Sequence, residues 1–371
     1  MRITRSMMVN NSIYLTSKQA EILADAQTIT STGRQINKPS DDPAAAGRLL
    51  SDRTTLSRYG QYESNISQAM TWIEASETTL DSASTFLQEA KDIMSSLSSG
   101  NTDTSEDYAE ELETIYAQVL SLANSRYGSG YMYGGGSNTQ TAPFSNTVSV
   151  SSGAAQDILF DMAEEASTLI IDVTDNTGNV VRGMTISGGT AGTNSIVWNG
   201  LDNNGNPLPD GQYDFSVSAI DEDGNVVAVF PSYRGSEEAK TVITGENSSS
   251  VLNNNGKKIF SEALSSLHQS ITAIENGEDQ DVFSTITEAL QTVIGGITTE
   301  RTAQACINSQ LETRQNRLDA LTVNLNSRIY ETETGSKEEA AIKLQAQENA
   351  YEEAIAAAKT ILNLPTLSDY L

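Results

Sequence analysis

Side chains that commonly carry out catalysis are scarce in this chain of 371 residues, which holds one histidine and one cysteine. A Ser–His–Asp triad needs a histidine base beside a nucleophile on a sharp turn. His268 stands instead in an apolar helical pattern with Leu264, Leu267 and Ile271, so we interpret it as a packing or surface residue. Cys306 has no second cysteine for an internal disulfide, and we interpret it as a small packing residue.

The candidate ligand loops are incomplete. Zinc sites need paired Cys or His residues, and the sequence has no such pairs. The run Gly134–Gly136 lacks the Lys-Ser/Thr pair and the preceding strand of a phosphate loop. The turns 202–206 and 221–225 resemble partial calcium loops, but Pro207 stands where the first would need glycine, and no Glu closes it. We expect hairpin turns there, with a bound cation as the alternative, and neither a cofactor nor an enzyme activity.

The composition favours long helices over a compact enzyme. Hydrophobic residues make up 37% of the chain and aromatic residues 6%. The 49 acidic and 22 basic side chains give a net charge of −27, which argues against a nucleic-acid partner. The start of the chain lacks the apolar run of a secretory signal, and no run of about 18 apolar residues could insert into a membrane. We expect a cytoplasmic protein, or one exported without a cleaved signal peptide.

Two long stretches without proline, 44–142 and 232–364, permit long helices. Apolar residues recur with heptad or near-heptad spacing, which is the coiled-coil pattern. The sets nearest the two ends are Met8, Leu15, Ile22, Ile29 and Ile36, and Leu344, Tyr351, Ile355, Ala358 and Leu362. Each stripe is narrow, so each helix needs a neighbouring helix. Spacing alone leaves open whether that helix belongs to this chain or to another copy.

The middle of the chain, about 144–250, has a different pattern. Glycine and asparagine become frequent, and short runs of β-branched and aromatic residues alternate with turn signals. The predicted strands are 168–173, 196–198, 213–220 and 226–230. Short strands at this spacing predict a small β-sandwich.

The predicted fold is therefore mainly α-helical with a β insert. We expect the N- and C-terminal helices to pack together into an elongated rod that holds the insert at its far end. The predicted parts are terminal coiled-coil helices at 1–40 and 330–371, a helical rod domain at 41–143 and 251–329, and an outer β domain at 144–250.

Four segments resemble the bacterial flagellin superfamily. Ser31–Leu50 contains Gly-Arg-Gln-Ile-Asn-Lys-Pro-Ser-Asp-Asp-Pro, which is similar to the N-terminal signature of that family in its hook–filament junction members. The other three segments are Leu122–Gly135, Gly256–Phe260 and Lys359–Leu371. In this order they resemble the family's turn rich in aromatic residues and glycine, its Gly-x-x-x-Phe motif where the chain returns to the helical domain, and its terminal Leu-Asp-Tyr-Leu. The similarity covers about 1–143 and 251–371, with Pro365 near the end as a departure.

The insert resembles a second flagellar module. Trp198–Ala219 contains Trp-x-Gly-x-Asp-x-x-Gly followed by Pro-x-Gly-x-Tyr, which is similar to the immunoglobulin-like module of hook-capping proteins. This resemblance implies an immunoglobulin-like core at 168–230 on the outer surface of a tube.

The resemblance implies a structural subunit that works by self-assembly outside the cell, after type III export. Its expected partners are further copies of itself, a second junction protein, hook protein, flagellin and an export chaperone. The apolar residues of the two terminal sets become the expected assembly interface. A joint between inner and outer helical domains is expected at Asn37, Pro39, Asp41, Asp42 and Pro43.

Two alternatives stay open. The chain could be a flagellin, the subunit of the filament, although flagellins more often have Ala and Gly around the Asp pair. It could also be an adhesin whose β module binds carbohydrate or a cation on a helical stalk.

Overall fold

The computed structural model describes residues 5–100, 105–136, 142–151, 154–155, 157–252 and 256–363. Pro365 and the terminal Ser-Asp-Tyr-Leu lie outside these ranges. The chain forms two compact units: the terminal unit combines Met1–Glu63 with Gln315–Leu371, and the central unit is Ser64–Arg314. Two long helices, α2 (Pro43–Ser98) and α5 (Gln280–Glu333), contribute one end to each unit.

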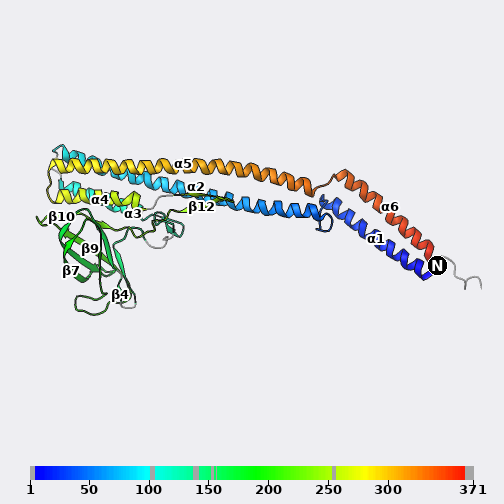
Figure 1. Cartoon of the computed structure of the whole chain (residues 1–371), viewed down its shortest axis with the longest axis horizontal. Helices are drawn as coiled ribbons and strands as arrows, with labels where there is room; N and C mark the ends of the chain where they lie inside the picture. The colour runs from blue at the N-terminus through cyan, green and yellow to red at the C-terminus, as the bar shows by residue number, and fades with distance from the viewer. Residues whose placement is uncertain are drawn as a thin grey trace, which may run out of the picture. The chain divides into compact units, whose positions relative to one another are not determined.

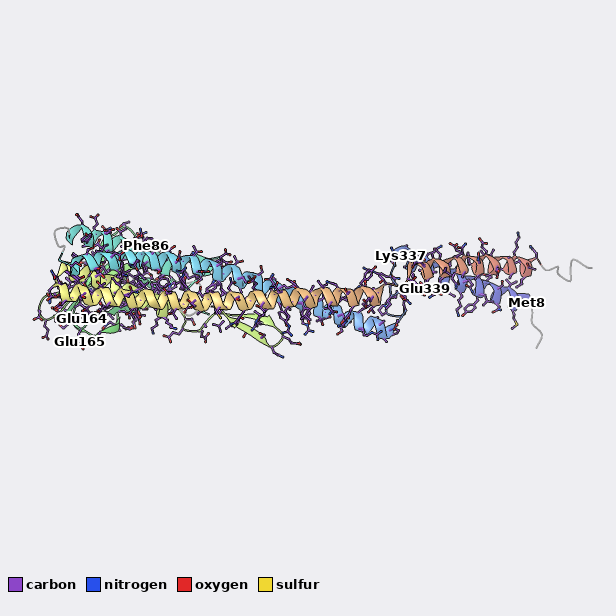
Figure 2. The ribbon with its side chains drawn as sticks, turned by 90° about the horizontal axis from the view of Figure 1, so that it is seen from above. Met8, Phe86, Glu164, Glu165, Lys337 and Glu339 are labelled. Atoms are coloured by element: carbon purple, nitrogen blue, oxygen red, sulfur yellow. The ribbon has the colours of Figure 1, made fainter. Side chains whose placement is uncertain are left out.

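The terminal unit is helical. Helices α1 (Arg5–Thr32) and α6 (Lys337–Leu362) lie side by side in both views (Figures 1 and 2). Helix α1 ends because Gly33 adopts a φ of 70°, which glycine tolerates best. Helix α2 begins at Pro43 because the Asp42 carboxylate accepts hydrogen bonds from the next two amides, at 3.0 and 2.9 Å.

The helices of the central unit form a conventional apolar core. Helices α3 (Ser105–Ala123) and α4 (Gly256–Glu275) pack on each other beside α2 and α5 (Figure 1). Both helices bury an apolar stripe, which includes Leu112, Ile115 and Val119 of α3 and Phe260, Leu264 and Leu267 of α4. The proline-free stretches predict long helices, and α2 and α5 confirm this prediction.

The β insert of the central unit is a sandwich of two antiparallel sheets. The larger has the strand order β4-β3-β9-β6-β7 with β10 attached to β9, and the smaller has the order β11-β5-β8. The strands are β3 (Thr147–Ser151), β4 (Ala154–Ala155), β5 (Ile158–Met162), β6 (Ala166–Thr174), β7 (Val180–Gly189), β8 (Gly192–Ile196), β9 (Gly211–Ile220), β10 (Val226–Val227) and β11 (Val229–Pro231). Their inward residues enclose one core with Trp198, Tyr213 and Phe215.

Specific hydrogen bonds join this sandwich to the helices of the same unit. Tyr233 Oη donates to the Tyr133 carbonyl at 2.9 Å, and the Gly256 amide donates to the same oxygen at 3.1 Å. The Asn276 side chain, between α4 and α5, pairs with both backbone groups of Val226 at 2.8 and 3.0 Å. Asn276 therefore makes the hydrogen bonds that a neighbouring strand would make. These bonds attach the insert to the helices in addition to its covalent connections.

Two short hairpins complete the unit. One is β1 (Arg126–Tyr127) with β2 (Gly130–Tyr131), and the other is β12 (Thr241–Gly245) with β13 (Ser248–Val251). Arg314 of α5 attaches the second hairpin to the helices, because it donates hydrogen bonds to the hydroxyls of Thr244 and Ser248. No helix in the described part of the chain is long and apolar enough to cross a bilayer.

The structure confirms the predicted fold class, which is mainly helical with a β-sandwich insert. Two of the predicted strands lie within β6 and β9, and 226–230 became the short pair β10 and β11. The segment predicted at 196–198 is the end of β8 and a loop, because Trp198 leaves the strand to fill the core. Strands β3, β5 and β7 were not predicted; β7 in particular contains three glycines, which lower strand propensity.

Candidate functional site

The pairing of α1 with α6 has a largely polar seam. The covered residues of α1 follow a 3–4 spacing, and so do those of α6. They include Val9, Ser12, Thr16, Gln19, Leu23 and Ala26 in α1, and Ala340, Leu344, Gln347, Tyr351, Ala354, Ala358 and Ile361 in α6. Within the described residues, Thr16 Oγ1 and Gln19 Oε1 are buried without a hydrogen-bond partner. Small and polar side chains fill most positions of this seam, and its larger apolar residues are only half-buried, so it contributes little burial of apolar surface.

Several larger apolar side chains of these helices point away from the seam. Leu15 is 50% exposed, Ile22 38%, Ile355 44% and Leu362 54%. In heptad terms, with Val9 and Ser12 at positions a and d, Leu15 and Ile22 occupy position g. With Leu344 at position a of α6, Ile355 and Leu362 occupy position e. Because α1 and α6 run in opposite directions (Figure 1), position g of α1 and position e of α6 lie on different sides of the seam, and apolar residues flank it on both sides.

The ten residues predicted for assembly divide into two groups. Met8, Ile29, Leu344, Tyr351 and Ala358 are half-buried along the α1–α6 pair, and Ile36 is half-buried in the loop after α1. The other four are the exposed flanking residues. In Figure 2, Met8 lies near one end of the pair, and Lys337 and Glu339, at the start of α6, lie near the other.

The rest of the terminal unit repeats this pattern. Between α2 and α5, the buried apolar residues of the unit are Ala45, Leu49, Leu318 and Leu325. Leu50, Val323 and Tyr330 each leave at least two-thirds of their surface exposed. Polar pairs supplement the small core: Arg328 contacts Asp52 at 2.6 Å, and Thr322 donates to Glu63 at 2.9 Å.

The loop between α1 and α2 is a compact turn. The Asp41 amide donates to the Lys38 carbonyl at 3.0 Å, with Pro39 at the second position of the turn. Asp41 Oδ2 in return accepts the amides of Asn37 and Lys38 at 2.9 and 2.8 Å. These backbone amides hold the pKa of the Asp41 carboxyl below its usual value. Five residues predicted for the joint thus form one turn and one helix cap.

A buried carboxylate fastens this loop to the end of α5. Glu333 is 8% exposed and forms ion pairs with Arg34 and with Arg53 of α2. Its carbonyl accepts the Gln35 amide at 2.6 Å, and Arg34 and Thr334 form an antiparallel bridge. The two connections of the terminal unit are therefore joined to each other. Sequence reasoning missed Glu333, because nothing in the Glu-Thr-Glu-Thr run 331–334 marks one acid as buried.

A pocket of about 580 Å³ lies beside the loop. Ile29, Ile36 and Ala45 give it an apolar part. Its charged lining residues are Asp25, Lys38, Asp41, Asp42 and Arg48, and Lys38 contacts Asp25 at 3.3 Å. Since both charge signs are present, this pocket does not select strongly for either a cation or an anion.

The residues considered for other chemistry have ordinary surroundings. His268 packs edge-on to the Tyr116 ring at 5.5 Å, and burial lowers its pKa. Cys306 is exposed on α5, so its interpretation as a packing residue was wrong. The acidic turns are hairpin turns in which Asp202 and Asp221 each accept two backbone amides of their own loop. Among the residues that the structure describes, no group of three side chains suits a metal ion.

Comparison with known proteins adds family information for both parts of the chain. Residues 3–132 match the family model of the bacterial flagellin N-terminal helical region. Residues 145–223 match the model of the FlgD Ig-like domain. The second match begins two residues before β3 and ends in the turn after β9, so it covers most of the sandwich.

Two curated relatives are flagellar hook-associated protein 3 from Salmonella typhimurium and from Escherichia coli. The first is 26% identical over 57% of this chain and 61% of the relative, and the second is 29% identical over 43% and 50%. The chain thus spans between half and about three-fifths of the relatives it matches.

A solved structure shares the fold. It is a flagellar hook-associated protein from Vibrio parahaemolyticus, which is 16% identical and covers 79% of this chain and 100% of its own, with a TM-score of 0.53. The chain therefore resembles flagellar hook-associated protein 3 in its helices, and carries between them an insert similar to the FlgD Ig-like domain.

Proposed function

We propose that this chain is a structural subunit of the bacterial flagellum that joins the hook to the filament. Support comes from the named relatives and from the flagellin-type helical region. The observation that carries the proposal is the arrangement of α1 and α6, with mostly polar and small side chains between the helices and apolar side chains exposed on both flanks. This arrangement suits helices that complete their packing against neighbouring copies.

The position of the exposed residues indicates how copies would pack. Leu15 and Ile22 flank one side of the seam, and Ile355 and Leu362 flank the other. A subunit with two different apolar sides can contact one neighbour through each side, which gives a ring or a helical array. A closed dimer would need only one side. The proposed assembly residues are the ten predicted ones, with these four as the direct contacts between copies.

The division of the chain follows from the same proposal. The helices 1–40 and 330–371 form the inner part, 41–143 and 251–329 the rod and 144–250 the outer domain, with residues 37–43 as the joint. Export by the type III route, a chaperone, and contacts with hook protein, flagellin and a second junction protein belong to the proposed role and involve no catalysis.

Deletion of the gene tests the role directly. Electron microscopy of the cells should show hooks without filaments, and intact flagellin should accumulate in the medium. Normal filaments on normal hooks would contradict the junction role and favour a minor filament subunit or an adhesin.

Complementation tests the assembly residues. The double substitution Leu15→Ser and Ile22→Ser should fail to restore filaments, although the protein is made and exported. The control is Glu21→Ser, at an exposed position on the face of α1 that points away from the seam and both flanks. Equal recovery with both variants would show that the flanking residues make no essential contact.

A further inference from the structure

The outer strand of the insert's larger sheet is long and has an open side. Strand β7 pairs with β6 on one side, and no strand in the described part of the chain pairs with it on the other. An open strand edge offers unpaired N–H and C=O groups to another polypeptide. Proteins usually protect such an edge with charge, proline or a covering loop.

A loop covers only the first part of this edge. The Asn203 amide donates to the Val181 carbonyl at 3.0 Å, and its side-chain oxygen accepts the Gly183 amide at 3.0 Å. The register with β6 is regular from Arg182 to Ser187. Because backbone groups alternate in direction along a strand, the amides and carbonyls of Thr185 and Ser187 also point outward. No loop in the described part of the chain forms hydrogen bonds with them, and they make the open part of the edge.

The inner face of β7 is only partly covered as well. Met184 and Ile186 pack on the sandwich core but remain half-buried, whereas their counterparts on β6 are fully buried. A further strand at this edge would cover them more completely. Apolar burial would then add to the backbone hydrogen bonds.

The charge distribution singles out the same edge. Between Thr147 and Pro231 the insert has twelve Asp and Glu residues and a single basic residue, Arg182. None of the charged residues lies between Gly183 and Leu201, which includes most of β7 and all of β8. Copies of so acidic a module repel one another on most faces. They can approach along this uncharged edge.

We propose that the inserts of two copies pair through β7, antiparallel and about a two-fold axis opposite Ile186. In this register Thr185 of each copy lies opposite Ser187 of the other. Each of these two pairs exchanges both N–H···O=C bonds, which gives four hydrogen bonds in all. The two Ile186 side chains become cross-strand neighbours, and Asn203 lies beyond the ends of the paired segment.

A second copy fits this edge better than an unrelated strand does. The open segment pairs with itself because an antiparallel pair is symmetric, and a two-fold contact requires such self-complementarity. Its absence of charge removes the repulsion between like copies without offering any charge to select a different partner. The pairing does not depend on the junction role, since it involves the insert and not the terminal helices.

Directed cross-linking of the full chain tests the register. In a Cys306→Ser background, one preparation carries Thr185→Cys and another carries Ser187→Cys. In the proposed register residues 185 and 187 of different copies have Cα atoms about 5.5 Å apart, within disulfide range. Like residues lie on a diagonal at about 7–8 Å, beyond that range. Under mild oxidation the mixture should give a disulfide-linked dimer and each preparation alone should give little.

A backbone substitution provides the second test. Thr185→Pro removes an outward N–H, which edge strands tolerate, so the insert should keep its fold. Thr185→Ser keeps the N–H and is the matched control. The proline variant should weaken dimerisation in sedimentation equilibrium by about tenfold or more, because two of the four hydrogen bonds are lost.

The outcomes separate this contact from helix-mediated assembly. Loss of dimers with Thr185→Pro but not with Leu15→Ser and Ile22→Ser places the contact in the insert. Cross-linking that is equal in the mixture and in the separate preparations, or absent from all of them, overturns the β7 pairing and leaves the junction proposal intact.

Discussion

The two units of this chain differ in how they treat apolar side chains and charge. Among the described residues, the terminal unit buries four hydrophobic residues and exposes twelve large ones, whereas the central unit buries 49 and exposes seven. The terminal unit has 13 basic and 15 acidic residues, and the central unit has 9 and 34. Net charges of −2 and −25 follow.

The difference indicates which unit is complete by itself. The central unit has a core that can offset the conformational entropy lost on folding, and its charge keeps it soluble. The terminal unit lacks such a core and lacks the repulsion that would keep copies apart. We infer that the central unit folds independently and that the terminal unit gains its full stability only against neighbouring copies.

The largest effect is expected in the core of the central unit. Phe260 is fully buried, and its ring centroid lies 4.8 Å from that of Tyr133. Phe260→Ala should lower the free energy of unfolding of the central unit by about 3–5 kcal/mol. Urea titration monitored by near-UV circular dichroism measures it. A loss as small as that from truncating an exposed residue, such as Val197→Ala, would mean that this core is not what stabilises the unit.

A smaller effect is expected at the joint of the terminal unit. Glu333→Gln removes the charge that Arg34 and Arg53 share in a buried position. Hydrogen exchange in the segments around residues 34 and 334 should become faster, corresponding to a loss of about 1–3 kcal/mol. Glu331→Gln, at a neighbouring exposed position, is the control and should change little. Equal exchange in both variants would contradict a fastened joint.

The sequence was informative wherever a local pattern determines structure. Proline-free heptad stretches predicted α2 and α5, and the alternation of Tyr213, Phe215 and Val217 predicted β9. The proline-free stretch that begins at residue 44 indicated a long helix there, and α2 begins at Pro43. In each case the signal lies within a few residues of the element that it predicts.

The sequence could not identify features that depend on which helices meet. The residues spaced by seven predict the seam of α1, yet Leu15 and Ile22 lie beside the seam and Thr16 and Gln19 lie within it. One hydrophobic stripe cannot show which flank its intramolecular partner covers. Glu333 shows the same limit, since its burial depends on two arginines about 280–300 residues away in the chain.

A substitution in the polar seam should reduce the difference in stability between the two units. Gln19→Leu should stabilise the α1–α6 pair by about 1 kcal/mol, because it replaces a buried oxygen without a partner by an apolar group. Hydrogen exchange of α1 should slow. Gln27→Leu makes the same change at an exposed position and is the control. No slowing, or equal slowing in both, would show that the seam does not limit the stability of the pair.

The smallest effect concerns pH and the central unit. Burial lowers the pKa of His268 from its ordinary value of 6.5, so the folded state binds a proton less readily than the unfolded state. Above pH 6.5 the titration of His268 should therefore not change the stability of the unit. As the pH falls below that value the unit should lose stability, until the folded-state pKa is reached. Replacing the histidine by phenylalanine, His268→Phe, should remove this part of the pH dependence of the melting temperature, while carboxylate titration at lower pH persists. An unchanged slope between wild type and variant would place the histidine in contact with water, and the tight α3–α4 packing inferred for the central unit would then be wrong at this position.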